Sequence, residues 1–255
     1  MQKQRAVKGV WGRVGKLNDM VAIVGGASSG MGAATARLFA QEGAAVVVAA
    51  RSTEKLAALV DEITQNGGTA LAVPTDANDR AAVAAMAKRA REQFGKIDVL
   101  VNSVGTNIKN RAFTEMGPAD WDMMIAHNLT VAYNLVDAVL PTMREQGAGT
   151  IIHYSSDAVQ KPNVVAGIAY QATKHGVRGL AHGTMMEERD RGIRVSVVFP
   201  GPCETPLMEK RPEPPPPEAF AKMLQPEDVA EAALFIAALP PRAFVPELVL
   251  AASLM

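Results

Sequence analysis

The sequence predicts an α/β protein, a single doubly wound domain around a mostly parallel sheet of about seven strands. Short apolar runs rich in β-branched residues alternate with helical stretches along the chain. The first such run leads into a glycine-rich loop and then an alanine-rich helix. With right-handed crossovers, this alternation gives a parallel sheet whose ligands bind at the carboxyl ends of the strands. The length of 255 residues suits one open sheet with helices on both faces.

The expected elements follow the apolar runs and the residues that interrupt them. A segment that is apolar throughout, such as 45–50, indicates a strand buried on both faces. Gly43 fits the end of a helix, and Asp79 fits the start of one. We expect strands at 20–24, 45–50, 71–73, 97–101, 149–154, 193–199 and 246–250. We expect helices at 30–41, 53–66, 79–94, 118–140, 170–189 and 226–239.

The glycine-rich loop has the features of a phosphate-binding turn. Gly26, Gly30 and Gly32 follow the first strand with the spacing G-x-x-x-G-x-G. Residues without a Cβ let the backbone approach a diphosphate closely, and the amino end of the next helix favours an anion. The alternative for such a loop alone is a tight strand-to-helix turn that binds nothing.

Composition excludes several classes of protein. Lys plus Arg and Asp plus Glu each number 26, so no global field recruits nucleic acid or an anionic membrane. The single Cys203 excludes an intramolecular disulfide and a cysteine-based metal cluster, and it fits a cytoplasmic protein. His153 and His175 lack carboxylates or cysteines at metal-ligand spacing, so no metal site is expected.

The sequence also predicts the structure of two segments outside the expected core. Residues 1–16 are basic and lack a long apolar run, which predicts a flexible arm before a folded domain at 17–255; an organelle-targeting peptide is the alternative. Residues 212–217, which include five prolines, predict a polyproline II spacer, with a partner-binding P-x-x-P segment as the alternative.

A possible catalytic pair lies near the start of the helix at 170–189. Tyr170 and Lys174 are four residues apart, so their side chains share one helix face. A pair of this kind alone is most often an exposed amphipathic pair. Here it follows the fifth strand and Ser156, in a chain that opens with the glycine loop. A nearby ammonium favours a phenolate, so Lys174 should lower the pKa of Tyr170.

These motifs in this order resemble the classical short-chain dehydrogenase/reductases over residues 17–250. The resemblance is carried by Gly26-x-x-x-Gly30-x-Gly32, Asp76, Asn102-x-x-Gly105, Asn128, Ser156, Tyr170-x-x-x-Lys174 and Pro200-Gly201 with Thr205. It implies a Rossmann-like catalytic domain that interconverts a secondary alcohol and a ketone, or reduces an aldehyde, with NAD(P) and without a metal. A homo-oligomer, tetramer or dimer, is implied as well. The alternative function is that of a catalytically silent, cofactor-binding regulator or scaffold on the same fold.

The resemblance also assigns roles. Tyr170 would exchange the proton with the substrate oxygen, Ser156 would donate to that oxygen, Lys174 would bind the nicotinamide ribose, and Asn128 would hold a relay water. The residues expected to bind the cofactor are Gly26, Ser28, Ser29, Gly30, Met31, Arg51, Ser52, Asp76, Ala77, Asn102, Val104, Gly105, Tyr170, Lys174, Pro200, Gly201 and Thr205. The segment 205–225 would close over the substrate, and its prolines predict a short, stiff cover.

The end of the second strand predicts the choice of cofactor. An acidic residue about twenty positions beyond the glycines binds the ribose 2′-OH of NAD, but this position is Ala50. The next residue, Arg51, can bind a 2′-phosphate through two charge-assisted hydrogen bonds. We therefore expect NADP(H) to be preferred over NAD(H). The alternative is a solvated arginine at a strand end.

Overall fold

The structure, a computed structural model, describes residues 15–253. Its sheet has seven strands in the order β3-β2-β1-β4-β5-β6-β7, and every pair is parallel. The expected single doubly wound domain is confirmed, with an all-parallel sheet where a mostly parallel one was predicted. The strands are β1 Val21–Gly25, β2 Ala45–Ala50, β3 Thr69–Pro74, β4 Val99–Asn102, β5 Gly149–Tyr154, β6 Ile193–Pro200 and β7 Glu247–Leu250.

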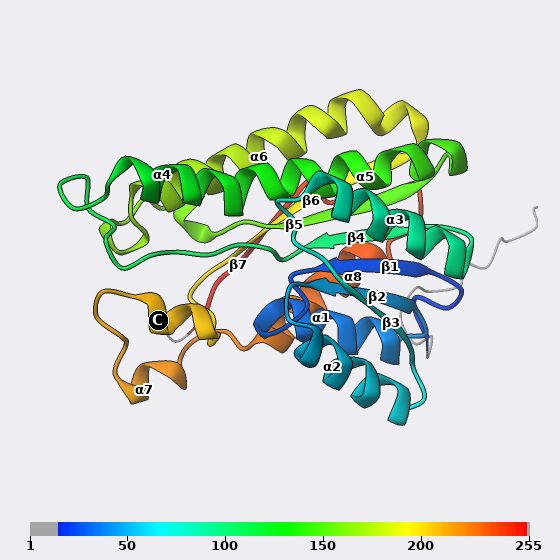
Figure 1. Cartoon of the computed structure of the whole chain (residues 1–255), viewed down its shortest axis with the longest axis horizontal. Coiled ribbons are helices and arrows are strands. Elements are labelled where there is room, and N and C mark those ends of the chain that lie inside the picture. The colour runs from blue at the N-terminus through cyan, green and yellow to red at the C-terminus, as the bar shows by residue number, and fades with distance from the viewer. Residues whose placement is uncertain (1–14, 254–255) are drawn as a thin grey trace, which may run out of the picture.

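Helices cover both faces of the sheet, so the domain has three layers (Figure 1). One face carries α1 Gly30–Gln41, α2 Thr53–Gln65 and α8 Pro226–Ala237. The other carries α3 Arg80–Phe94, α4 Pro118–Ile125, α5 Val131–Gln146 and α6 Ile168–Glu188. The short helix α7, Pro217–Phe220, lies in the segment between β6 and α8, away from the sheet.

Local signals in the sequence start and stop several helices. The Asp79 carboxylate accepts hydrogen bonds from the backbone N–H groups of Ala81 and Ala82, at 2.9 and 3.2 Å, and so caps α3. Gly95 ends the same helix at φ +83°, a conformation that favours glycine. The predicted bounds of this helix are therefore correct to within one residue.

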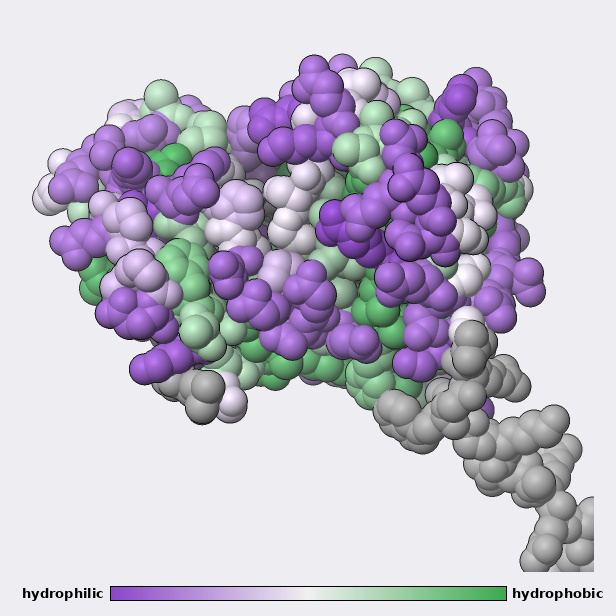
Figure 2. All heavy atoms as spheres, turned by 90° about the horizontal axis from the view of Figure 1, so that it is seen from below, coloured by the Kyte–Doolittle hydropathy of each residue, from purple (hydrophilic) through white to green (hydrophobic). Residues whose placement is uncertain are grey.

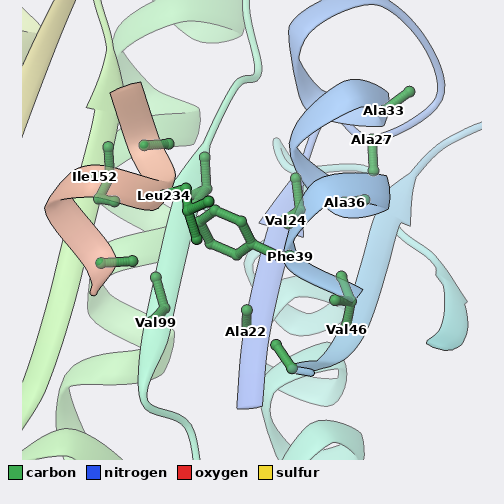
Figure 3. Packing of buried hydrophobic residues seen from close by; sticks show 14 of the residues in the cluster. Ala22, Val24, Ala27, Ala33, Ala36, Phe39, Val46, Val99, Ile152 and Leu234 are labelled. Atoms are coloured by element: carbon green, nitrogen blue, oxygen red, sulfur yellow. The ribbon is translucent and has the colours of Figure 1, made fainter. Parts of the chain in front are cut away.

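The core beneath α1 is built around Phe39, which is fully buried. Figure 3 shows its ring between β1 and β4, near Val24, Leu234 and Val99. Small residues such as Ala36 let α1 lie close to the sheet. This packing fixes the amino end of α1, and with it the glycine loop, at the carboxyl edge of β1.

The register of the sheet brings the polar ends of several strands to one edge. Gly25 of β1 pairs with Asn102 of β4 on one side and with Ala49 of β2 on the other. The chain order reverses between β1 and β4, because β2 and β3 lie to one side of β1 and the later strands to the other. Such a switch point opens a crevice at the carboxyl ends of the strands.

The predicted helix at 118–140 is wrong in two respects. It is interrupted by a π-helical turn at Ala126–Thr130 that separates α4 from α5, and it continues through Pro141 to Gln146. The helix runs past the proline because Thr142 and Met143 are buried in the core, and their packing offsets one lost backbone hydrogen bond. By length and composition alone, Pro118–Gln146 could cross a membrane, but 44% of its most apolar window is buried inside this fold.

Smaller differences concern strand ends and the surface. β3 begins two residues before the predicted position, and β4 covers 99–102 where 97–101 was expected. The arm expected at 1–16 lies outside the described residues except for Gly15 and Lys16; the backbone N–H of Lys16 donates to Glu42 Oε2 at 2.8 Å. Figure 2 shows the face seen from below in Figure 1, on which hydrophilic side chains predominate.

Candidate active site

Two cavities open at the carboxyl edge of the sheet and meet at shared residues. The first, of about 360 Å³, lies along the glycine loop and the ends of β1, β2 and β4. The second, of about 280 Å³, lies beyond β5 and β6. Met31, Thr205 and Leu207 line both. The arrangement gives a long site for one ligand and an adjoining site for another.

The glycine loop forms a cradle that side chains would fill. A Cβ on Gly26 would stand 2.8 Å from the backbone of Ser103, and one on Gly32 would stand 2.3 Å from the Gly26 carbonyl oxygen. Ser29 precedes α1 but its side chain does not cap the helix, so the first N–H groups of α1 are open toward the first cavity. Free N–H groups at a helix start bind a diphosphate, so the cradle fits a dinucleotide.

The far end of the first cavity carries the residues predicted for the adenosine. Arg51, Ser52, Asp76 and Ala77 all line it. The pKa of Asp76 is lowered, first by a hydrogen bond from the backbone of Asn78 and more weakly by the charge of Arg51. Asp76 is therefore a carboxylate that can accept hydrogen bonds, and Arg51 is an exposed cation beside it.

The rest of the lining of the first cavity includes predicted residues and residues that were not predicted. Val104, Gly105 and Thr205 line it as expected, together with Ser28, Ser29, Gly30 and Met31. Sequence reasoning missed several lining residues: Thr75, Asn78, His127, Val131, Leu135, Leu207 and Lys210. Lys210 could have been found only through its position in the predicted cover, because nothing in its local sequence marks it.

Asn102 and Lys174 were predicted to bind the cofactor, but they do not line either cavity. The Asn102 amide oxygen accepts from the backbone N–H of Val104 at 3.1 Å, and its nitrogen lies 3.1 Å from His153 Nδ1. Asn102 therefore shapes the loop that follows β4. His153 is fully buried, and burial, aided by the charge of Lys174, lowers its pKa to about 4, so it is neutral.

The four predicted catalytic residues come together from three segments: the π-helical turn at Asn128, the loop after β5 at Ser156, and α6 with Tyr170 and Lys174. Lys174 Nζ lies 5.7 Å from the ring centre of Tyr170 and donates to the Tyr154 carbonyl at 2.9 Å. A Cβ on Gly105 would stand 3.2 Å from both Lys174 Nζ and Asn128 Oδ1, so both atoms flank this glycine. Ser156 forms a hydrogen bond with Tyr170 that favours the phenolate.

Asn128 lies in the π-helical turn and is completely buried. Its amide oxygen accepts from the backbone N–H of Thr106 at 2.7 Å, and its nitrogen donates to the Thr106 carbonyl at 3.0 Å and to Thr173 Oγ1 at 3.2 Å. Asn128 thus ties the loop after β4 to the helix that carries Tyr170 and Lys174.

The pKa of Tyr170 differs from the expectation. Burial raises its pKa, the hydrogen bond from Ser156 and the charge of Arg111 oppose this, and Asp157 reinforces it. The predicted lowering of the pKa of Tyr170 by Lys174 is therefore wrong for this structure, since desolvation outweighs the favourable interactions. Burial also lowers the pKa of Lys174 to about 8. Tyr170 is a neutral phenol near neutral pH, ready to donate a proton.

The second cavity lies next to Tyr170 and Ser156. The predicted Pro200 and Gly201 line it, as does Cys203, whose pKa burial raises to about 12. Arg111, Asp157 and Arg211 also line it and were not singled out from the sequence. The cavity therefore combines a proton donor with fixed charges.

The segment that is expected to cover the substrate, 205–225, contains only short helical turns and no long helix. A 3₁₀ turn at Pro206–Lys210 comes first, the proline-rich stretch follows, and α7 occupies Pro217–Phe220. Arg111 holds the cover, because its guanidinium donates to the carbonyls of Ile108, Val165 and Lys210 at 2.5, 2.6 and 2.8 Å. Among residues 15–253, no group of three or more His, Cys, Asp or Glu side chains is placed to hold a metal ion.

Comparison with known proteins decides the family. The short chain dehydrogenase family model matches residues 20–215. The chain belongs to the short-chain dehydrogenase/reductase family. It is 35% identical over 234 residues to the 3-oxoacyl-(acyl-carrier-protein) reductase of Thermotoga maritima, a match that covers 87% of this chain and 92% of that protein.

Solved structures of short-chain dehydrogenase/reductases agree with the fold. A metagenomic short-chain oxidoreductase in complex with NADP is 35% identical, with a TM-score of 0.81 over 94% of this chain and all of that one. The 3-ketoacyl-(acyl-carrier-protein) reductase from Brucella melitensis complexed with NADH is 29% identical, with a TM-score of 0.83 over 92% and 98%. This chain is accordingly an NAD(P)-dependent oxidoreductase that acts on CH–OH and C=O groups of a small-molecule substrate.

Proposed function

We propose that this short-chain dehydrogenase/reductase is an NADP(H)-preferring enzyme that interconverts a secondary alcohol and a ketone, or reduces an aldehyde. The observation that carries the proposal is the convergence of four residues beside the two cavities: Ser156 and Tyr170 line the second cavity, and Asn128 and Lys174 flank Gly105, a lining residue of the first. A catalytically silent regulator or scaffold, the alternative, would not need this set of proton donors and acceptors beside a cradle for a dinucleotide.

The proposed roles follow from the chemistry of each group. The neutral phenol of Tyr170 gives its proton to the carbonyl oxygen of the substrate, and Ser156 donates a hydrogen bond to the same oxygen. Lys174 stabilises the phenolate that Tyr170 becomes. Its Nζ lies beside Gly105, a lining residue of the first cavity, from where it would bind the ribose of the cofactor. Asn128 holds the relay water that connects Lys174 with solvent. When bound, the nicotinamide supplies or accepts the hydride.

The cofactor would be held by the residues of the first cavity. The open N–H groups at Gly30 and Met31 take the diphosphate, Asp76 and Ala77 take the adenine, and Val104 and Gly105 take its ribose. Arg51 beside Ala50, without a carboxylate at the end of β2, supports a preference for the 2′-phosphate of NADP(H). The relatives bind either form, since one is complexed with NADP and another with NADH.

We also propose that the enzyme is a cytoplasmic homo-oligomer, a tetramer or a dimer. The single buried cysteine suits a reducing compartment. Large apolar side chains are exposed on α4, α5 and α6, including Trp121, Tyr133 and Met186. Light scattering of the purified protein tests the assembly, and a monomeric mass would contradict it.

The experiment that tests the function is an absorbance assay at 340 nm with NADPH against a panel of neutral ketones, aldehydes and oxo acids. We expect NADPH oxidation with at least one carbonyl compound, and loss of that activity in Tyr170→Phe. NADPH binding without oxidation across the panel, under conditions where the protein is folded, would support the silent regulator. Turnover that Tyr170→Phe retains in full would contradict the proposed proton donor.

A further inference from the structure

The second cavity holds more positive than negative charge. Arg111, Arg211 and Asp157 are its ionisable lining residues besides Tyr170 and Cys203, which are neutral because burial raises the pKa of each. Two guanidinium groups therefore oppose one carboxylate. The formal net charge of the residues that line the cavity is positive, although the formal net charge of the whole chain is zero.

Arg111 is a fixed cation. It is 8% exposed, and the three carbonyls of Ile108, Val165 and Lys210 hold its guanidinium in place. These bonds use three of the five N–H groups of an arginine and leave two free. A buried cation that only carbonyl dipoles satisfy has no carboxylate to neutralise it, so it favours an anion in the adjoining cavity.

Arg211 is the second cation, and it follows a residue whose carbonyl Arg111 binds. The bond from Arg111 to the carbonyl of Lys210 fixes the residue directly before Arg211. Burial lowers the pKa of Arg111, and the nearby charge of Arg211 lowers it further. In the part of the chain that the structure describes, the Arg211 side chain has no hydrogen bond and no carboxylate within ion-pair distance. Its donors are therefore available to a ligand.

Asp157 offsets this charge only in part. Its Oδ1 accepts the hydroxyl of Ser156 at 3.2 Å, and its half-buried carboxyl has a raised pKa because of burial. Lys161 and Arg211 are the cations whose charges act on it. The Asp157 carboxylate is thus bonded to Ser156 and feels the charge of Arg211 without forming an ion pair with it. One of the two guanidinium charges in the cavity stays unbalanced.

We propose that the second cavity selects carbonyl substrates that carry an anionic group, a carboxylate or a phosphate, which Arg211 binds while Tyr170 and Ser156 bind the carbonyl oxygen. The inference rests on the proposed function, because it assumes that the carbonyl is reduced in this cavity. Arg111 is a positioning residue in this scheme: it holds the cover so that Arg211 overhangs the substrate.

The test uses pairs of compounds that share a carbonyl and differ in charge. 4-Oxopentanoate is compared with methyl 4-oxopentanoate, and dihydroxyacetone phosphate with dihydroxyacetone, in NADPH oxidation assays. We expect kcat/KM to favour the anion by about tenfold or more in at least one pair, because charge-assisted hydrogen bonds to arginine are strong. The pair that shows the preference distinguishes a carboxylate from a phosphate.

Variants assign the preference to Arg211. Arg211→Gln should reduce the anion-to-neutral ratio of kcat/KM to about one, and Arg211→Lys should retain part of it. Lys109→Gln is the matched control, because Lys109 is an exposed cation on the loop of Arg111 but outside the cavity lining, and it should leave the ratio unchanged.

The outcomes separate the inference from the proposed function. Reduction of neutral compounds with no preference for the anion, or a preference that Arg211→Gln retains, overturns the inference and leaves the function standing. An increase in the Kd of NADPH in Arg211→Gln, with the ratio unchanged, also overturns it. If no carbonyl compound is reduced, the proposed function fails. Calorimetric titration of 4-oxopentanoate and dihydroxyacetone phosphate in the presence of NADP+ then decides only the anion site: binding that Arg211→Gln weakens supports this site, and no binding overturns it as well.

Discussion

Lys210 donates a hydrogen bond from Nζ to Thr106 Oγ1 at 2.7 Å and so joins the cover to the loop that Asn128 holds. The two residues are 104 positions apart in the chain. Lys210 also lines the first cavity, so this bond lies at the edge of the cofactor site. Thr106 therefore connects the cover to the π-helical turn that holds Asn128.

Breaking this bond should speed release of the cofactor. Thr106→Val and Lys210→Met each remove one partner and keep most of the apolar volume. Because the bond is exposed, its contribution should be about 0.5–1 kcal/mol, and the dissociation rate of NADPH should rise roughly two- to fivefold. Stopped-flow fluorescence of NADPH gives the rate. The double variant should match the single ones; additive effects would show that the two side chains act independently.

Tyr170→Phe should separate chemistry from cofactor binding. It removes the proton donor but no group of the diphosphate cradle, so kcat should fall by about 10² or more while the Kd of NADPH changes less than about twofold. Lys174→Ala should impair both quantities, because the ammonium supports the phenolate and the ribose. Steady-state rates and fluorescence titration measure them. Equal effects of the two substitutions on Kd would contradict the division of roles.

Arg51 should determine the choice of cofactor. Arg51→Ala should lower kcat/KM for NADPH roughly tenfold and raise its Kd, with little change for NADH, because only NADPH carries the 2′-phosphate. Ala50→Asp should invert the preference, since a carboxylate accepts from the 2′-OH and repels the phosphate. Rates and binding with both cofactors are measured. Equal values of kcat/KM for the two cofactors in the unmodified enzyme would contradict the prediction.

Glu188 should contribute to stability in a pH-dependent way. It is buried, and Arg144 and Arg191 hold its carboxylate. The hydrogen bond from Arg144 is the main reason that its pKa is lowered. A lowered carboxyl pKa stabilises the fold above the unfolded value of about 4.5, and the stabilisation is lost as the pH falls through the folded pKa.

Glu188→Ala should therefore lower the free energy of unfolding by about 1–3 kcal/mol at pH 7, less than for a fully buried pair because both arginines face solvent. The loss should shrink toward pH 3. Urea denaturation at several pH values measures it, with the exposed Glu187→Ala as the control. A loss that stays constant from pH 7 to pH 3 would show that packing, and not charge, is responsible.

Cys203 should be nearly inert in the native protein. It is 4% exposed, and burial raises its pKa to about 12 from 9.0. At pH 8 its thiolate fraction should be about 10³-fold below that of a free thiol, so 5,5′-dithiobis(2-nitrobenzoate) should react very slowly. The protein unfolded in guanidinium is the control and should release one equivalent rapidly. A native rate within tenfold of the unfolded one would contradict the burial of this thiol.

The sequence by itself determined the layers of the fold and the positions of the main motifs. The alternation of fully apolar strands with helices is a local pattern, and parallel pairing follows because each crossover helix returns the chain to the same end of the sheet. The glycine spacing likewise predicted the cradle, since only glycine permits the close backbone contacts at Gly26 and Gly32.

Only the tertiary structure decided how charges are distributed in the site. Arg111 and Arg211 are 100 positions apart, and nothing in either segment indicates that they share a cavity. The π-helical turn at Asn128 depends on long-range bonds to Thr106 and Thr173, and so it was missed. The pKa of Tyr170 rises where a local argument predicted a fall, because desolvation depends on every group that excludes water from the site. Such effects arise from burial and from contacts between distant segments, which a local sequence pattern does not contain.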